Sequence, residues 1–341
     1  MESFTRRLPI YLLLDCSESM AGDAIRDLQN GVSAMIAHLQ GDPQAIETAY
    51  LSVITFATEA HQAVPLTEVL NFRMPPLTVR TGSALGAALK LLVNCMRREV
   101  RKTTSTQKGD YKPLVILLTD GQPTDDYEDI AEEIRKQRNP SIANIYAIGC
   151  GPDADTETLR EVTDIVLRMK DVTTESWKKL FIWLSASVQS TSVALAEGRE
   201  GQNLNLPALP ADALEVAPRT NVPYEPRQVF LHGRCGKSGE PYLMRFAKRP
   251  GGYTYVALTS HPMEVVEKQV SGRSGNSINT SQLEGVPACP YCENPVAVAC
   301  DCGTLVCHSG NPSAPFRCPA CRAQGQIGGG GSGFDVSQAQ G

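Results

Sequence analysis

The sequence of 341 residues has few features that would place the protein in a membrane or on a nucleic acid. It contains no apolar run approaching the roughly 18 residues of a membrane-spanning helix, and it lacks a Walker phosphate loop. The short apolar run at residues 8–14 ends on Asp15, without the small-residue cleavage site of a signal peptide. The net charge of −5 argues against a basic surface for nucleic acid or anionic lipid. We therefore expect a cytoplasmic protein with no membrane span and no nucleic-acid partner.

Cysteine is scarce over most of the chain and concentrated near its end. Four of the eleven cysteines are spread over the first 288 residues, and seven fall within residues 289–321. A disulfide framework of a secreted protein would be distributed over the whole fold, so this asymmetry favours a local metal site. The remaining composition, with 42% hydrophobic and 20% charged residues, is typical of a soluble globular protein. The length predicts about two domains.

Predicted strands and helices alternate over residues 1–196. Continuous apolar runs, several of them bounded by an acidic residue, are typical of strands that are buried on both faces of a parallel sheet. The predicted strands are 8–14, 50–57, 114–118, 144–148 and 165–169, and the predicted helices are 21–39, 83–96, 126–138, 156–162 and 175–189. This order predicts an α/β fold with a doubly wound, mostly parallel sheet and helices on both faces. Ligands bind such sheets beyond the carboxyl ends of the strands.

Hydroxyl and carboxylate side chains gather in three loops at that edge of the predicted sheet. They are Asp15, Ser17 and Ser19 in the first loop, Thr81 and Ser83 in the second, and Asp120 in the third. Each loop alone is typical of a turn or a helix cap. Together they offer oxygen ligands that suit a hard cation such as Mg²⁺ or Mn²⁺. None of the three loops carries a histidine or lysine that could act as a base, so we expect binding and not hydrolysis.

The three loops resemble those of a von Willebrand factor A domain, because Asp15-x-Ser-x-Ser, Thr81-Gly-Ser and Thr119-Asp-Gly occur in the order of that family. The resemblance covers about residues 5–195 and implies a metal-ion-dependent adhesion site. It implies that Ser17 and Ser19 bind the cation directly, and that Asp15 and Asp120 bind it directly or through water. Ser83 is the expected ligand of the second loop, with Thr81 as the alternative. In this family one coordination position stays open for a carboxylate of a partner protein.

The character of the sequence changes after residue 196. Residues 197–226 contain five prolines and little periodicity, which predicts a linker. Three short runs at 228–231, 242–247 and 253–259 predict a small antiparallel segment within residues 227–287, followed by a flexible connection. Residues 324–341 include seven glycines and predict a flexible tail that cannot pack, with a docking peptide for a partner as the alternative.

Residues 288–323 predict a small zinc-binding module. The candidate ligands are Cys289, Cys292, Cys300, Cys302, Cys307, His308, Cys318 and Cys321. Two Cys-x-x-Cys knuckles about thirty residues apart are a strong signal for zinc, because each knuckle offers two thiolates to one tetrahedral ion. A module this short has little core, so the metal would supply most of its folding free energy.

The eight candidate ligands match two four-coordinate zinc ions, but their pairing stays open. One arrangement is crossed, with Cys289, Cys292, Cys307 and His308 on one ion and Cys300, Cys302, Cys318 and Cys321 on the other. A simpler arrangement puts both outer knuckles on a single zinc. His308 is the least secure ligand because it is adjacent to Cys307, and His232 or Cys235 could replace it.

The combination of an A domain, a strand segment and a cysteine-rich end resembles TerY-type proteins that carry a TerY-C metal-binding domain. The resemblance implies a role in bacterial tellurium resistance and stress response, with a PP2C-type phosphatase and a serine/threonine protein kinase as cytoplasmic partners. The resulting hypothesis is a non-enzymatic scaffold that captures an acidic side chain of a partner through its cation. The alternative is a RING-like ubiquitin ligase, although Gly310 stands where the RING spacing requires a cysteine.

Overall fold

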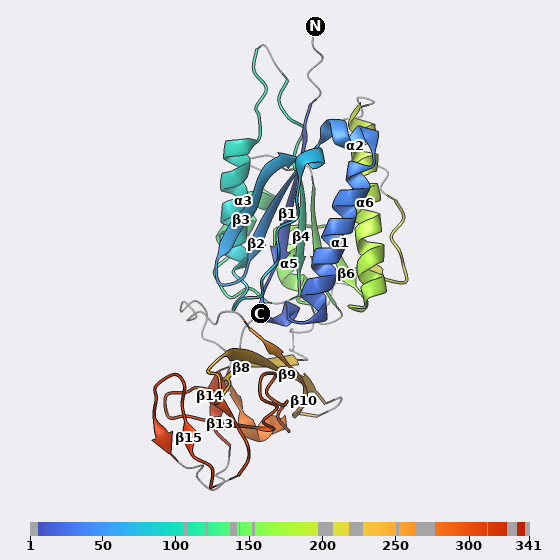
Figure 1. Cartoon of the computed structure of the whole chain (residues 1–341). Coiled ribbons are helices and arrows are strands. Elements are labelled where there is room, and N and C mark those ends of the chain that lie inside the picture. Colours follow the sequence, from blue (N-terminus) through green and yellow to red (C-terminus); the bar gives the residue numbers. More distant parts are fainter. Residues whose placement is uncertain are drawn as a thin grey trace.

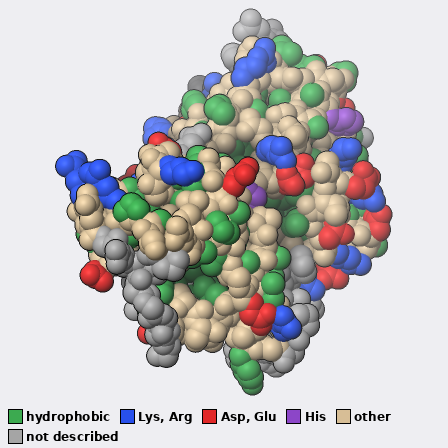
Figure 2. Space-filling view, turned by 60° about the horizontal axis from the view of Figure 1, so that its bottom comes forward, with side chains coloured by type: hydrophobic (Ala, Val, Ile, Leu, Met, Phe, Trp, Pro, Cys, Tyr) green, Lys and Arg blue, Asp and Glu red, His purple; other side chains and the backbone are tan. Residues whose placement is uncertain are grey.

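The computed structural model consists of an N-terminal α/β unit and a smaller C-terminal β unit that lies against one end of it (Figure 1). It describes residues 6–105, 108–120, 122–136, 142, 144–151, 154–196, 207–217, 228–249, 252–263, 277–311, 313–325 and 333–337. Within these residues, no helix is both long enough and apolar enough to cross a membrane. Figure 2 brings the end with the C-terminal unit forward and shows basic and acidic side chains interspersed over much of that face.

The N-terminal unit is built on a seven-stranded sheet of order β3-β2-β1-β4-β5-β6-β7. The strands are β1 (Leu8–Asp15), β2 (Ala49–Phe56), β3 (Ala60–Glu68), β4 (Leu114–Thr119), β5 (Asn144–Gly149), β6 (Val166–Met169) and β7 (Leu214–Val216). Along the sheet order β2-β1-β4-β5-β6, neighbouring strands are parallel. The edge strands β3 and β7 are antiparallel to their neighbours β2 and β6. The predicted doubly wound, mostly parallel sheet is confirmed.

Helices cover both faces of this sheet (Figure 1). They are α1 (Asp23–Gln40), α2 (Pro43–Thr48), α3 (Leu85–Glu99), α4 (Glu128–Arg135), α5 (Thr156–Val162) and α6 (Thr174–Ala196). Side chains of β1 alternate between two cores, with Leu12 and Leu14 in the core beneath α1 and α6, and Tyr11 and Leu13 in the core beneath α3 and α4. This alternation explains why the run at residues 8–14 is apolar throughout.

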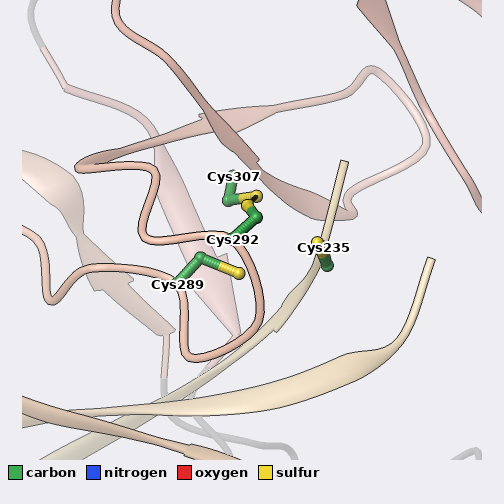
Figure 3. Close-up of side chains that lie close together, drawn as sticks. All are labelled: Cys235, Cys289, Cys292 and Cys307. Atoms are coloured by element: carbon green, nitrogen blue, oxygen red, sulfur yellow. Dashed lines mark hydrogen bonds between the residues drawn. The ribbon is translucent and has the colours of Figure 1, made fainter. Parts of the chain in front are cut away.

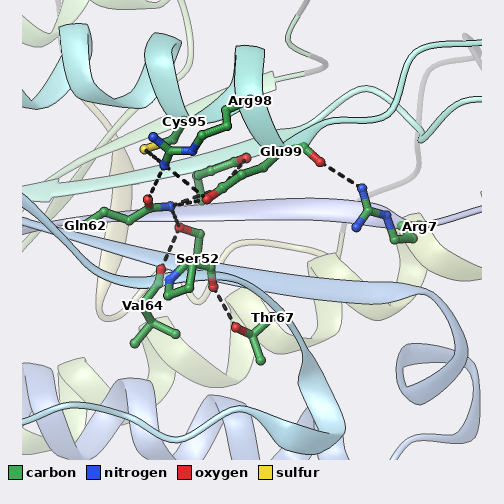
Figure 4. A network of polar contacts seen from close by, with 10 residues as sticks. Arg7, Ser52, Gln62, Val64, Thr67, Cys95, Arg98 and Glu99 are labelled. Atoms are coloured by element: carbon green, nitrogen blue, oxygen red, sulfur yellow. Dashed lines mark hydrogen bonds and ion pairs between the residues drawn. The ribbon is translucent and has the colours of Figure 1, made fainter.

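A polar network fastens the end of α3 to the sheet, at the opposite end from the predicted cation site (Figure 4). The Glu99 carboxylate accepts hydrogen bonds from Gln62 Nε2 at 2.8 Å and from the Tyr11 hydroxyl at 3.1 Å. The Glu99 backbone carbonyl accepts from Arg7 Nη2 at 2.9 Å, and Arg7 also forms an ion pair with Asp110. These contacts hold α3 against β1 and β3, and thereby fix the helix whose first turn borders the predicted site.

The C-terminal unit contains a six-stranded sheet of order β12-β10-β9-β8-β14-β13. Its strands are β8 (Gln228–Arg234), β9 (Pro241–Lys248), β10 (Tyr255–Pro262), β12 (Leu283–Glu284), β13 (Val296–Ala299) and β14 (Leu305–His308). The predicted antiparallel segment corresponds to β8, β9 and β10. Because β14 pairs with β8, this segment and the cysteine-rich stretch form one sheet and not two successive modules.

Parts of the expected linker and tail are ordered elements of the two units. Residues 207–217 include β7, and the Trp183 indole nitrogen donates to the Pro207 carbonyl at 3.0 Å. Short strands β11 (Ser277–Asn279), β15 (Phe316–Arg317), β16 (Gln324–Gly325) and β17 (Asp335–Ser337) complete the C-terminal unit.

The tail does pack in part, contrary to the prediction, because β17 pairs with β11 and buries Val336 against Ile278. The rest of the expected linker, at 197–206 and 218–226, and tail residues 326–332 and 338–341 lie outside the described residues, as does most of the expected connection before β11.

Candidate metal sites

The first candidate site lies at the carboxyl ends of β1 and β4, which are neighbours in the sheet. Asp15 ends β1, and its carboxylate is fully buried. Its Oδ2 accepts hydrogen bonds from Ser83 Oγ at 3.0 Å and from Thr119 Oγ1 at 2.5 Å, and its Oδ1 accepts from the Ser17 backbone N–H at 2.8 Å. Asp15 therefore joins all three loops that the sequence singled out.

Hydroxyl groups continue this network from Ser17 to Asp120. The Ser17 and Ser19 hydroxyl oxygens lie 3.0 Å apart, and Ser19 Oγ donates to Asp120 Oδ1 at 2.5 Å. The structure thus brings together all five predicted cation ligands, and we call Asp15, Ser17, Ser19, Ser83 and Asp120 the oxygen site. The alternative residue, Thr81, points its hydroxyl to Thr58 Oγ1 at 2.9 Å.

The two carboxylates of the oxygen site are electrostatically unfavourable when no cation lies between them. Burial raises the pKa of Asp15 despite the hydrogen bonds that it accepts. Burial, together with repulsion from Asp15, raises the pKa of Asp120 to about 7. A divalent cation would compensate both charges, and a set of carboxylates and hydroxyls fits a hard ion such as Mg²⁺.

Two further side chains hold the loops of the oxygen site in place. The fully buried Glu18 accepts a hydrogen bond from the Gly82 N–H at 2.7 Å, which ties the first loop to the second. The Asp125 carboxylate accepts from the N–H groups of Gly86 and Ala87 at 2.8 Å each, at the start of α3. The sequence did not indicate either residue as functional. Glu18 is one of the two variable positions of the Asp-x-Ser-x-Ser motif, and Asp125 belongs to no motif.

The second candidate site, cluster A, consists of Cys235, Cys289, Cys292 and Cys307 (Figure 3). Their four sulfur atoms all lie within 4.8 Å of one another, and the sulfurs of Cys292 and Cys307 are 3.4 Å apart. A tetrahedral zinc ion with Zn–S bonds of about 2.3 Å separates its sulfurs by about 3.8 Å. The arrangement therefore fits one zinc ion and is much too wide for a disulfide bond.

The third candidate site, cluster B, consists of Cys300, Cys302, Cys318 and Cys321. Its sulfur atoms also lie within 4.8 Å of one another, with 3.5 Å between Cys300 and Cys321 and 3.7 Å between Cys302 and Cys318. Cys302 and Cys321 are exposed, so this cluster is closer to the surface than cluster A. These four residues are the second ligand set of the crossed arrangement that the sequence offered as one of two alternatives.

Tight turns begin at Cys235 and at the first cysteine of each of the two Cys-x-x-Cys knuckles. In all three turns the carbonyl of that cysteine accepts a hydrogen bond from the N–H four residues later. This later residue has positive φ in each turn, which is unusual for residues other than glycine. The pairs are Cys235 with Gly239 at φ 81°, Cys289 with Glu293 at φ 60°, and Cys318 with Arg322 at φ 65°.

His308 lies outside both clusters, and Cys235 takes the place expected for it. Adjacent residues of a strand point to opposite faces, so on β14 the side chain of Cys307 enters cluster A while that of His308 does not. His308 Nδ1 instead accepts a hydrogen bond from the Gly310 N–H at 3.2 Å. The two outer knuckles belong to different clusters, which differs from the single-zinc arrangement.

Cys235 in cluster A and Cys302 in cluster B have thiols with a lowered pKa. Burial opposes ionisation of Cys235, but hydrogen bonds from Ser238 and from the Lys237 N–H outweigh it and lower the pKa of the thiol to about 6. Hydrogen bonding with the side chain and backbone of Thr304 lowers the pKa of Cys302 to about 6. The thiolate is the form of cysteine that binds a metal ion.

Comparisons with known proteins agree with the two-unit description. The family model for the von Willebrand factor type A domain matches residues 10–180, and that for the TerY-C metal binding domain matches residues 225–341. A search of curated proteins found no match.

Solved structures to which this chain is similar include the pilus adhesin SpaC from Lactobacillus rhamnosus GG, at 14% identity and a TM-score of 0.43, covering 55% of this chain and 30% of the adhesin. BatB from Bacteroides thetaiotaomicron is 17% identical with a TM-score of 0.38, covering 54% of this chain and 100% of BatB. Proximal thread matrix protein 1 from the mussel byssus, with a zinc-occupied MIDAS motif, is 16% identical with a TM-score of 0.37, covering 53% of this chain and 48% of that protein.

Because the first family model spans half of the sequence, the chain belongs to the von Willebrand factor type A domain family, and it carries a TerY-C metal binding domain after its A domain.

Proposed function

We propose that this protein is a non-enzymatic scaffold whose oxygen site holds Mg²⁺ and captures a carboxylate of a partner protein. Von Willebrand factor type A domains commonly mediate protein–protein interaction. The observation that carries the proposal is the pair of desolvated carboxylates, Asp15 and Asp120, which are linked through Ser17 and Ser19, with the Ser83 hydroxyl also donating to Asp15. Mg²⁺ requires six oxygen ligands in nearly octahedral geometry, so a partner carboxylate can complete its coordination.

Clusters A and B would hold two structural zinc ions in the C-terminal unit. Each cluster offers four thiolates, which fill a tetrahedral ion and leave no open position for a substrate or a catalytic water. Cluster A draws ligands from distant parts of the sequence, and its ion would join the end of β8 to the knuckle at Cys289 and to β14. The ion of cluster B would join the segment around Cys300 to the knuckle at Cys318. The expected role of zinc is therefore to stabilise the fold.

The resemblance to TerY-type proteins supports a more specific form of this proposal. We propose a cytoplasmic bacterial signalling assembly in tellurite or stress response, with a PP2C-type phosphatase and a serine/threonine kinase as partners. An acidic side chain on one of these partners would complete the coordination of Mg²⁺. The C-terminal unit would provide a second surface for docking.

The proposal is tested by capture of the purified candidate phosphatase and kinase on the immobilised full chain. We expect capture in Mg²⁺ and its loss in Mg²⁺-free buffer or with Asp120→Ala. The matched control is Asp129→Ala, which removes an exposed carboxylate of α4 and should leave capture unchanged. Equal capture by wild type and Asp120→Ala, with and without Mg²⁺, contradicts this mechanism.

A RING-like ubiquitin ligase remains the second candidate because the two clusters interleave along the sequence. Ligands of cluster B at Cys300 and Cys302 fall between Cys292 and Cys307 of cluster A, as in a cross-braced module. However, Cys235 directly follows β8 of the same sheet and does not come from the cysteine-rich stretch. A reconstituted autoubiquitination assay distinguishes the two candidates, and we expect no product.

A further inference from the structure

The C-terminal unit packs directly on the loops of the oxygen site. Figure 1 shows β8, β9 and β10 beneath the end of the A domain at which the oxygen site lies. A small apolar cluster joins the two units, in which Ala21 of the first loop packs with Leu243 and Met263, and Phe230 lies against them. The face of the A domain that a partner must approach is thus already in contact with another part of the chain.

A second contact lies immediately after Ala21. Gly22 has φ of 90°, and a Cβ atom built there would lie 2.8 Å from Cε1 of His261. The imidazole ring therefore rests on the backbone of the first loop, where only glycine leaves enough room. Close packing of this kind places β10 within contact distance of the segment that follows Ser19.

Polar side chains of the C-terminal unit reach the same loop. The His232 Nε2 atom lies 2.9 Å from Oε1 of Glu18, the residue between Ser17 and Ser19 in the sequence. The angles at this contact are not those of a hydrogen bond. Arg245 Nη1 donates to the Ala21 carbonyl at 3.4 Å, and Nη2 donates to Gln228 Oε1 at 3.0 Å. The Arg245 guanidinium also lies 5.4 Å from the ring centroid of Phe230.

Arg245 is only partly satisfied in this position. Its Nε atom is buried and has no hydrogen-bond partner among the described residues. Burial lowers the pKa of the guanidinium, and the negative charge of Asp120 acts against this effect. The positive charge of Arg245 compensates part of the charge of Asp120, which is also what a divalent cation at the oxygen site would do.

We propose that the C-terminal unit is an intramolecular cover of the oxygen site, in which the charge of Arg245 competes with the divalent cation. The cover residues are Phe230, His232, Leu243, Arg245, His261 and Met263. The inference rests on the proposed function, since it concerns access to the same cation. A partner carboxylate has to approach from beyond the strand ends, so the cover must withdraw before the partner binds.

The two events are thermodynamically linked. If closure of the cover weakens cation binding, then cation binding weakens closure by the same factor. The apolar contacts of Ala21, Leu243 and Met263 favour the closed arrangement, while the cation and the partner favour the open one. The scaffold would thereby bind its partner only when the cation and the partner together outweigh the cover.

Titration of the zinc-loaded full chain with Mg²⁺ by calorimetry tests the role of Arg245. Arg245 and the divalent cation are both attracted by Asp120, so removal of the arginine charge should strengthen cation binding. We therefore expect Arg245→Gln to bind Mg²⁺ several-fold more tightly than wild type. Arg245→Lys keeps the charge and should bind Mg²⁺ within about twofold of wild type.

A second variant keeps Arg245 and instead disrupts the apolar contact of the cover with the first loop. Met263→Asp places a carboxylate in the apolar contact with Ala21 and should open the cover. We expect tighter Mg²⁺ binding and faster amide hydrogen exchange in the peptide that contains Ala21. The matched control is Tyr253→Asp, which adds the same charge at a side chain that is 86% exposed. Unchanged zinc content shows that the C-terminal unit is still folded.

The outcomes separate the two proposals. If Arg245→Gln and Met263→Asp bind Mg²⁺ no more tightly than wild type, the cover is overturned while the oxygen site stands. If neither wild type nor these variants bind Mg²⁺, the cation site fails and the cover fails with it. Tighter binding in both variants, with wild-type behaviour in Arg245→Lys and Tyr253→Asp, supports the cover.

Discussion

Asp120→Asn is expected to stabilise the protein when no divalent cation is present and to remove most of its stabilisation by Mg²⁺. The amide keeps an oxygen that can accept the hydrogen bond from Ser19. It removes the charge that burial and Asp15 make unfavourable, as the raised pKa of Asp120 indicates. Arg245 loses one of its attractions in the variant, which offsets a small part of the gain.

The magnitude follows from the pKa of Asp120. A rise from 3.8 to about 7 corresponds to about 4 kcal/mol at 1.36 kcal/mol per pKa unit, so we expect a gain on the order of 2–4 kcal/mol above pH 7. In wild type, the protonated carboxyl group of Asp120 stabilises the fold below pH 4. This contribution is lost as the pH rises from about 4 to about 7 and the group ionises. The advantage of Asn therefore increases over that window.

Thermal unfolding of wild type and Asp120→Asn in Mg²⁺-free buffer provides the assay. At about 2–4 °C per kcal/mol for a domain of this size, the melting temperature of the variant should be roughly 5–10 °C higher at pH 8. Addition of Mg²⁺ should raise the melting temperature of wild type and leave that of the variant nearly unchanged. A variant that is less stable than wild type at pH 8, or equally stabilised by Mg²⁺, refutes the reasoning.

Three further predictions concern other parts of the structure. Elemental analysis should find two zinc ions per chain in wild type and in His308→Ala but about one in Cys235→Ser, and loss of zinc from His308→Ala contradicts the proposed ligand sets. Gly86→Ala should lower the free energy of unfolding by about 1–3 kcal/mol in chemical denaturation, because the new Cβ would lie 2.2 Å from the Asp126 carbonyl oxygen. Val336→Asp should speed amide exchange in β11, and unchanged exchange would show that β17 does not hold it.

The sequence was sufficient to predict the central strands of the A domain but not its edges. β1 and β4 are apolar throughout because both of their faces are buried, and this pattern is recognisable without a structure. β3 has alternating exposure and contains Pro65, so it looked unlike the other strands. β7 is only three residues long, and its place in the sheet depends on pairing with β6, which no local pattern shows.

The oxygen site was predictable because its ligands lie within short motifs at strand ends. Glu18 and Arg245 were not, because Glu18 stands at a variable position of the first motif and Arg245 acts through a contact between the two units. Cys235 was an alternative at best, since it lies far from the other cysteines in the sequence and is brought to Cys307 by the pairing of β8 with β14. Ligand counting left both the crossed sets and the single-zinc arrangement open. The exclusion of His308 depends on the face of β14 that it occupies, which the sequence does not show.

The central claim, that the oxygen site holds a divalent cation, is tested most directly by calorimetric titration of the zinc-loaded full chain with Mg²⁺. The account predicts one saturable site per chain in wild type and in Asp129→Ala, and no binding in Asp120→Ala. Equal Mg²⁺ binding by wild type and Asp120→Ala, or none by wild type, would contradict it.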